Sequence, residues 1–382
     1  MNIPYRRFEN LQKNIIKPAN RREENIKSKW EENVRKVVPY TPGEQPKIKN
    51  IIKLNTNENP YPPAPGVLQA LKEIDIDSLK LYPDPAAQNL VDALAEFYGL
   101  RSNQVFVGVG SDDVLAMLFL TFFNSKKPIL FPDVTYSFYD VWADMLRIPY
   151  EMQPLDENLH IKKEDYYKEN GGVVFPNPNA PTGVLQELSD FEDIVKHNQD
   201  VIVIIDEAFI DFGGNSALPL IEKYDNVVIV QTFSKSRSMA GMRIGYAMAN
   251  EKLIKYLNDV KYSFNSYTMN TTAIALGVPA IKDREYFEKT VNKVITTRER
   301  VKRELKALGF VFEDSMSNFL FVTHPQLSME KLFTDLRKEG IIVRHFSKPE
   351  RIREYLRITI GTDEQMDTLI GFLKRYLESA GF

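Results

Sequence analysis

The 382-residue sequence contains no cysteine, and this absence removes several kinds of chemistry. A chain without thiols forms no disulfide bond, has no thiolate nucleophile and offers no cysteine ligand to zinc or to an iron–sulfur cluster. Histidine is also scarce, and the four histidines are scattered without the spacing of a metal site. We therefore expect no resident metal.

An excess of one charge and long apolar runs are lacking as well. The chain has 49 Lys and Arg against 52 Asp and Glu, a formal net charge of −3. Proteins dedicated to nucleic acid normally carry a basic excess, so this balance argues against such a role. No apolar run approaches the ~18 residues that a membrane-spanning helix needs. We expect neither a nucleic acid nor a membrane as a partner.

The first 29 residues are basic and have no apolar core of a signal peptide. Phe8, Leu11, Ile15 and Ile16 fall on one face at helical spacing, which favours a short amphipathic helix. We expect this extension to lie on the protein's own surface or on a dimer partner. A basic arm for a membrane or a nucleic acid is the alternative. The expected location is the cytoplasm.

Three divisions of the chain are predicted. Residues 1–65 form the N-terminal extension and a proline-rich crossing arm, because repeated prolines forbid a regular helix. Residues 66–275 form a large domain and residues 276–382 a smaller α+β domain. The strands expected in the large domain are 105–109, 128–131, 172–175, 201–205 and 227–231.

The expected fold class is α/β. The large-domain strands are apolar without alternation and are separated by helical stretches at 90–98, 113–122 and 188–196, as in a mostly parallel sheet covered on both faces. In the smaller domain we expect a long charged helix over 283–308, which Gly309 ends. The remaining small-domain elements are expected at 319–322, 341–344 and 356–360 as strands and at 329–338 and 363–378 as helices.

The strongest local motif surrounds Lys235, which follows a predicted strand directly. A lysine amine can form a Schiff base with an aldehyde cofactor, and a nearby cation such as Arg243 lowers its pKa. Ser234 and Arg243 would then hold a phosphate dianion. Taken alone, the motif also fits a solvated lysine in a polar loop.

Two acids, Asp206 and Glu207, end another buried strand. Ligands of open α/β sheets bind outside this edge, and a buried acid is costly without a cation. Asp206 therefore needs a partner such as a protonated pyridine nitrogen, although an acid here could also cap a helix. Lys235 follows it by 29 residues, enough for the next strand.

Three turns add candidates at the same edge. The glycine turn before Ser111 and Asp112 presents backbone N–H groups and a helix dipole to an anion. Tyr136 follows a third strand, where its ring could stack on a flat cofactor. Residues 177–183, with the sequence NPNAPTG, must form a rigid turn.

These motifs, together with residues 57–61, occur in the order seen in fold-type-I, pyridoxal-phosphate-dependent aminotransferases. From about Trp30 to its end the chain resembles the histidinol-phosphate aminotransferase branch, and the sequence of residues 39–46, PYTPGEQP, supports this branch. The resemblance implies pyridoxal 5'-phosphate as the cofactor, with Lys235 as its covalent partner and proton carrier. Asp206 would pair with the pyridine nitrogen, and Tyr136 would stack on the ring.

The resemblance also implies binding roles and a homodimer with shared active sites. The implied ligands of the cofactor are Ser111, Asp112, Asn179, Ser234, Arg243 and, from the neighbouring subunit, Tyr61. The implied ligands of the substrate phosphate or carboxylate are Tyr40, Arg344 and Arg357.

Two positions depart from the pattern. Many relatives have asparagine at position 180 and tyrosine at position 209, and both side chains would donate to the cofactor's phenolic oxygen. This chain has Ala180 and Phe209. Asn177 and Asn179 are the candidates for the missing donor.

The function implied by the resemblance is transfer of an amino group from L-histidinol phosphate to 2-oxoglutarate. A threonine-phosphate decarboxylase would share the lysine, the aspartate and the arginines, and another aminotransferase specificity stays open. A non-catalytic regulator on the same fold is a remote alternative.

Overall fold

A computed structural model of the chain describes residues 29–47 and 50–381. Residues 1–37 form a unit of their own, whose described part contains a short 3-10 helix at Lys29–Asn33. The expected amphipathic helix around Phe8–Ile16 lies outside the described residues. The second unit, from Val38 onward, holds every element discussed below.

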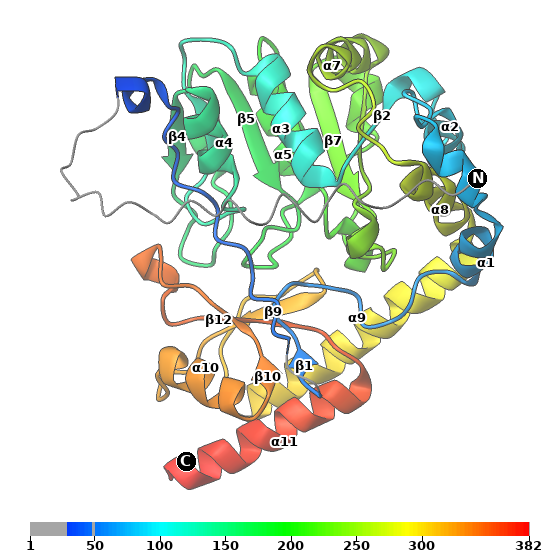
Figure 1. The fold of residues 1–382 in the computed structure, drawn as a ribbon. Helices are drawn as coiled ribbons and strands as arrows, with labels where there is room; N and C mark the ends of the chain where they lie inside the picture. The colour runs from blue at the N-terminus through cyan, green and yellow to red at the C-terminus, as the bar shows by residue number, and fades with distance from the viewer. Residues whose placement is uncertain (1–28, 48–49, 382) are drawn as a thin grey trace, which may run out of the picture. The chain divides into compact units, whose positions relative to one another are not determined.

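Within the described residues, seven strands form the larger sheet, in the order β2-β8-β7-β6-β5-β3-β4 (Figure 1). Neighbouring strands from β7 to β4 are parallel, whereas β8 is antiparallel to both of its neighbours. This mostly parallel sheet confirms the predicted α/β class. The strands are β2 (Val105–Gly108), β3 (Ile129–Pro132), β4 (Tyr150–Gln153), β5 (Gly172–Pro176), β6 (Val203–Asp206), β7 (Val227–Thr232) and β8 (Gly245–Ala249).

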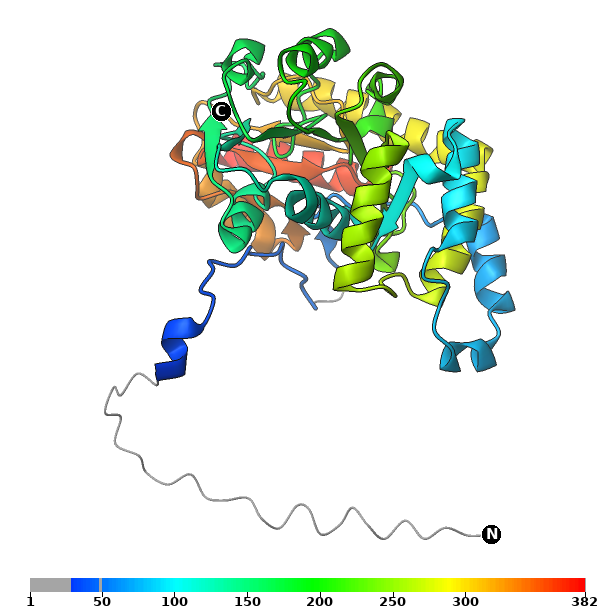
Figure 2. The same ribbon diagram turned by 90° about the horizontal axis from the view of Figure 1, so that it is seen from above.

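Helices cover both faces of this sheet, because successive strand side chains point to opposite sides. Val203 and Ile205 of β6 join an apolar cluster with Phe191 of α5, whereas Ile204 joins a second cluster with Leu115 of α3. Figure 2 shows helices on opposite sides of the sheet. The first cluster includes residues of α1 (Pro65–Glu73), α2 (Gln88–Tyr98), α5 (Leu188–His197), α6 (Leu220–Lys223) and α8 (Thr271–Lys282). The second includes residues of α3 (Ser111–Phe122), α4 (Tyr139–Leu146) and α7 (Glu251–Phe264).

A smaller antiparallel sheet, in the order β11-β12-β9, lies beside a third apolar cluster. The strand expected at 341–344 divides into two, because its halves pair with different partners. Ile341 and Ile342 pair with β1 of the arm, whereas Arg344 pairs with Arg357 of β12. The elements here are β1 (Ile52–Lys53), α9 (Arg284–Ala307), β9 (Phe319–Val322), α10 (Met329–Lys338), β10 (Ile341–Ile342), β11 (Arg344–His345), β12 (Leu356–Thr359) and α11 (Asp363–Ala380).

The ends of α9 follow from its sequence. Asp283 caps its start by accepting a hydrogen bond from the Tyr286 N–H at 3.0 Å. Gly309 follows its end with a φ of +81°, a left-handed conformation that glycine adopts without strain. The predicted helix over 283–308 therefore agrees with the structure to within one residue at each end.

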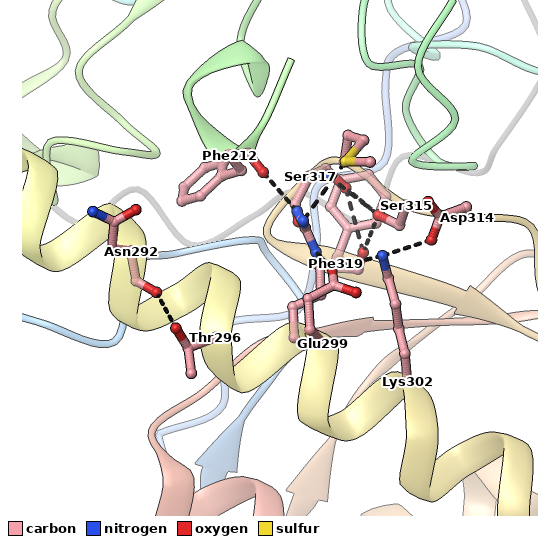
Figure 3. Close-up of polar contacts among 11 residues, drawn as sticks. Phe212, Asn292, Thr296, Glu299, Lys302, Asp314, Ser315, Ser317 and Phe319 are labelled. Atoms are coloured by element: carbon pink, nitrogen blue, oxygen red, sulfur yellow. Dashed lines mark hydrogen bonds and ion pairs between the residues drawn. The ribbon is translucent and has the colours of Figure 1, made fainter.

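The middle of α9 joins the two sheets through buried polar contacts. The Arg298 guanidinium donates to the Phe212 carbonyl at 2.7 Å and to the Ser317 carbonyl at 2.9 Å. Figure 3 shows Phe212 above α9 and Ser317 beside it, with Lys302 directed at Asp314. Since Arg298 is 2% exposed, these bonds fix the loop before β9 against the region that follows β6.

The domain boundaries at residues 65 and 275 stay a prediction. Position 275 falls inside α8, whose residues on both sides of it join the cluster under the larger sheet. Among the described residues, no helix is both long and apolar enough to cross a membrane.

Candidate active site

A cavity of about 180 Å³ lies at the carboxyl ends of β5, β6 and β7. Strands from the middle of the larger sheet supply its floor, and the arm and the smaller sheet supply its other walls. It brings together all the expected site residues except Asn179 and Tyr61. Its lining includes Tyr40, Ser111, Asp112, Tyr136, Asp206, Ser234, Lys235, Arg243, Arg344 and Arg357.

Lys235 is the amine of this cavity. Its Nζ donates to the Thr56 carbonyl of the arm at 3.2 Å and lies 5.5 Å from the centre of the Phe209 ring. Burial, and then the charge of Arg357, lower the pKa of Lys235 to about 8. A useful fraction of the amine is therefore neutral near pH 7, as a nucleophile or a base must be.

Asp206 is the last residue of β6 and faces the same cavity. The Tyr139 hydroxyl donates to its Oδ2 at 3.1 Å, and the Ala208 N–H donates to its Oδ1 at 3.2 Å. Burial raises the pKa of Asp206 to about 7. Within the described part of the chain it forms no ion pair, so a bound cation would restore its charge.

An anion site forms where α3 begins. Gly110 has a φ of +86°, and a Cβ there would lie 2.3 Å from Nη2 of Arg243, so only glycine leaves room for this guanidinium. The twelve-residue helix presents its first N–H groups and its dipole at Ser111. Nη1 of Arg243 lies 3.4 Å from the Ser234 hydroxyl.

The Asp112 side chain makes contacts that the resemblance did not imply. Its carboxylate accepts from Nη2 of Arg243 at 3.0 Å and from the Tyr136 hydroxyl at 2.6 Å. Because a carboxylate repels a phosphate, its side chain orients these two neighbours, and its backbone N–H is the group left for an anion. Burial, and then this carboxylate, raise the pKa of Tyr136.

Two arginines form a second cationic region. Arg344 and Arg357 lie directly opposite each other on β11 and β12. Arg357 donates to the Asn55 carbonyl at 3.0 Å, and its Nε has no hydrogen-bond partner among the described residues. Burial, and then Arg344, lower the pKa of Arg357 to about 10. Neither arginine forms an ion pair with a carboxylate in the described ranges, so both charges stay available to an anion.

Tyr40 lies at the edge of this cationic region. Its ring stacks on Phe138 with centroids 4.1 Å apart, and Phe138 stacks in turn on Trp142 at 5.0 Å. The arm thus reaches the cavity through an aromatic contact with the start of α4.

Asn179 and Asn177 have their amide groups bound elsewhere. The Asn179 amide donates to the Val134 carbonyl at 2.9 Å and to Thr182, while the Asn177 side chain bonds the backbone of Gln186. Neither residue is among those that line the cavity, and a donor from either of them stays a prediction.

The cavity wall at positions 180 and 209 is apolar. Ala180 and Phe209 belong to the core cluster under the smaller sheet, where Phe209 meets the edge of Phe319 at 5.1 Å. The two departures seen in the sequence therefore extend this core up to the cavity.

Tyr61 lies outside the cavity of its own chain. Its ring faces Nζ of Lys293 at 5.0 Å, and it packs on the small-sheet cluster. Contact of Tyr61 with the cofactor phosphate of a second copy of the chain, which the resemblance implies, stays a prediction.

Sequence reasoning missed Tyr139 and Thr56. Tyr139 begins α4 among other aromatic residues, and nothing in this stretch of sequence marks its hydroxyl as the partner of Asp206. Thr56 reaches Lys235 across 179 residues, through a backbone carbonyl that no residue type reveals.

We expect Tyr139→Phe to move the pH dependence of the enzyme. In the wild type the hydrogen bond from Tyr139 lowers the pKa of Asp206. Phenylalanine cannot donate this bond, so the pKa of Asp206 should rise further in the variant. The acid side of the kcat/KM profile should move to higher pH by up to about one unit, with a loss of roughly 5- to 10-fold.

Tyr166→Phe is the matched control for this profile. Tyr166 is also buried, and its hydroxyl has no hydrogen-bond partner among the described residues. It should keep the wild-type pH profile. An unmoved profile in Tyr139→Phe would show that this hydroxyl does not act on Asp206.

The residues of the cavity fit pyridoxal phosphate. An amine of lowered pKa suits its aldehyde, and a buried acid without a cation suits its ring nitrogen. The start of α3, Ser234 and Arg243 suit its phosphate.

The fold and this set of groups define a pyridoxal-phosphate-dependent enzyme of fold type I. The chain belongs to the aminotransferase class I and II family, whose family model matches residues 49–373. Within this family it is similar to histidinol-phosphate aminotransferases at about half of its positions.

One relative in sequence and two solved structures of the same fold illustrate this similarity. The chain is 51% identical over 350 residues to the histidinol-phosphate aminotransferase of Lactococcus lactis subsp. cremoris, covering 92% of this chain and 98% of that protein. The solved histidinol-phosphate aminotransferase of Clostridium acetobutylicum has a TM-score of 0.80 and 25% identity, covering 86% of this chain and all of that one. The enzyme from Sinorhizobium meliloti, solved in complex with pyridoxal 5'-phosphate, has a TM-score of 0.78 at 22% identity, covering 86% and 91%. The predicted family, cofactor and enzyme class are thereby confirmed.

Proposed function

We propose that the protein transfers the amino group of L-histidinol phosphate to 2-oxoglutarate, giving imidazole acetol phosphate and L-glutamate in histidine biosynthesis. The observation that carries this proposal is the pair Arg344 and Arg357, which line the cavity together with Lys235 and have no acidic partner among the described residues. A phosphate dianion can use both guanidiniums, whereas a carboxylate needs one. The relative at 51% identity supports the same donor.

Pyridoxal phosphate, when bound, supplies an electron sink for the charge left as the Cα–H bond of the amino donor breaks. Asp206 holds a proton on the ring nitrogen, and its burial strengthens this contact. Ser111, Ser234 and Arg243 bind the cofactor phosphate, and the Tyr136 ring packs beside the cavity.

Lys235 moves the proton. Its amine, with a pKa of about 8, can take the proton from Cα of the donor and would deliver it to the C4′ carbon of the cofactor. Arg344, Arg357 and Tyr40 bind the substrate phosphate and so orient Cα toward this amine. The amino group and its electrons pass from donor to 2-oxoglutarate, and no external oxidant is needed.

Amino-donor profiling of the holoenzyme tests this proposal. Each donor is mixed with the enzyme without 2-oxoglutarate, and loss of the visible cofactor absorbance is followed. We expect histidinol phosphate and glutamate to react, and histidinol to react poorly. Release of carbon dioxide from threonine phosphate would favour the decarboxylase instead, and a faster reaction with an unphosphorylated donor would overturn the proposal.

We also propose a homodimer with shared sites, located in the cytoplasm. A hollow of about 730 Å³ lies between the loop around Tyr82 and α8, and the exposed Leu81 and Tyr82 line it. The Tyr82 ring meets the exposed Tyr267 ring with centroids 4.7 Å apart. An exposed apolar patch on a globular protein marks an interaction surface.

A mixing experiment tests the shared sites. Lys235→Ala and Tyr61→Ala are each expected to be nearly inactive alone. After equal mixing and subunit exchange, half of the dimers are hybrids with one intact site, so activity should return to roughly a quarter of wild type. No recovery in exchanged dimers, or an active monomer by sedimentation, would exclude sharing.

A further inference from the structure

The two arginines of the cationic region share one aromatic ring. The guanidinium carbons of Arg344 and Arg357 both lie over the ring of Phe346, each 5.6 Å from its centroid. Phe346 follows β11 two residues after Arg344, so both side chains point to the same face. It lines a neighbouring hollow and does not line the catalytic cavity.

This arrangement addresses an electrostatic problem. Residues directly opposite on antiparallel strands are close neighbours, and like charges there repel. In the described ranges no carboxylate pairs with either arginine. The face of an aromatic ring attracts cations without carrying a charge, so Phe346 stabilises both guanidiniums and leaves them charged. An acid in its place would neutralise them and compete with an anionic substrate.

The packing around Phe346 fixes its position. Its ring meets the edge of Phe321 at 6.0 Å, and Phe321 stacks on Tyr355 at 4.6 Å. The Arg357 guanidinium also lies over Phe319 at 5.3 Å, so aromatic rings hold it on two sides. The geometry fits two arginines held ready for one ligand.

We propose that Phe346 is a positioning residue that sets the preference for phosphorylated amino donors, by holding Arg344 and Arg357 together for a dianion. The identity of the amino donor in this inference rests on the proposed function. The binding of a dianion by the two arginines does not depend on that function.

Phe346→Leu in the holoenzyme is the test, with inorganic phosphate as the probe. Leucine keeps an apolar side chain but loses the aromatic face. We expect the inhibition constant of phosphate and the KM of histidinol phosphate to rise roughly 5- to 30-fold, with kcat nearly unchanged. The glutamate half-reaction should change less than about 3-fold, since one arginine suffices for a carboxylate.

Two further variants separate positioning from a general structural effect. Phe346→Tyr keeps the ring and should stay near wild type. Phe333→Leu removes a partly buried ring that packs on the cluster under the smaller sheet and meets His345. Since no arginine of the described ranges lies over this ring, the variant should leave phosphate inhibition unchanged. Equal losses for both donors in Phe346→Leu, or an unchanged phosphate inhibition constant, would overturn the inference. If phosphate inhibition shifts while wild type does not react with histidinol phosphate, the proposed function fails and the inference stands.

Discussion

Replacing Lys235 by alanine is expected to leave a folded protein that has lost transamination and the visible absorbance of the bound cofactor. Lys235 is the amine in the cavity, held by the Thr56 carbonyl with its pKa lowered to about 8. Alanine removes both the covalent partner of the cofactor aldehyde and the proton carrier. The two roles together correspond to a loss of roughly 10⁴-fold or more. Absorbance spectra, circular dichroism and a coupled assay measure the result.

Lys261→Ala is the matched control for this loss. Lys261 is another buried lysine, 3% exposed, and it does not line the cavity. Its Nζ donates to the Pro85 carbonyl at 2.5 Å. The Lys261→Ala variant should keep the spectrum of the bound cofactor, even if the stability of the protein falls. A normal cofactor spectrum in Lys235→Ala would refute the assignment of the active-site lysine.

Arg344→Ala should weaken the reaction of histidinol phosphate more than that of glutamate. Loss of a charged hydrogen bond in a closed site costs about 2–4 kcal/mol, or roughly 30- to 1000-fold in kcat/KM. Glutamate can still use Arg357, which lies deeper and binds the arm at Asn55. Separate half-reactions with the two donors measure the difference.

Arg353→Ala serves as its control, because Arg353 pairs with Glu330 and Glu350 on the outer side of the same region. It should change neither half-reaction appreciably, since exposed ion pairs contribute little. Equal losses for both donors in Arg344→Ala would mean that Arg344 does not discriminate between them.

The central strands could be predicted from the sequence, because each is a short β-branched run between turns. The edge strand β4 could not, since Glu151 and Met152 are exposed and the run is polar. The antiparallel β8 was also missed. It begins at Gly245, where a Cβ would lie 2.2 Å from Gly110, and its small residues give a weak strand pattern.

The site was predictable where a motif stands at the end of a strand, as with Asp206 and Lys235. It was not predictable where the contact depends on tertiary packing. Tyr139 donates to Asp206 across 67 residues of sequence. The position of Phe346 beside two arginines can be recognised only once Arg344 and Arg357 are known to face each other. The amide bonds of Asn177 and Asn179 likewise depend on how their turn folds back on its neighbours.

The central claim is that this cavity moves nitrogen from a phosphorylated amino donor to 2-oxoglutarate. Histidinol phosphate with an isotopically labelled amino group, incubated with the holoenzyme and 2-oxoglutarate, tests it most directly. Mass spectrometry of the products should find the label in glutamate, in equal amount to the imidazole acetol phosphate formed. Label that stays in the donor, or is released as ammonia, would contradict the account.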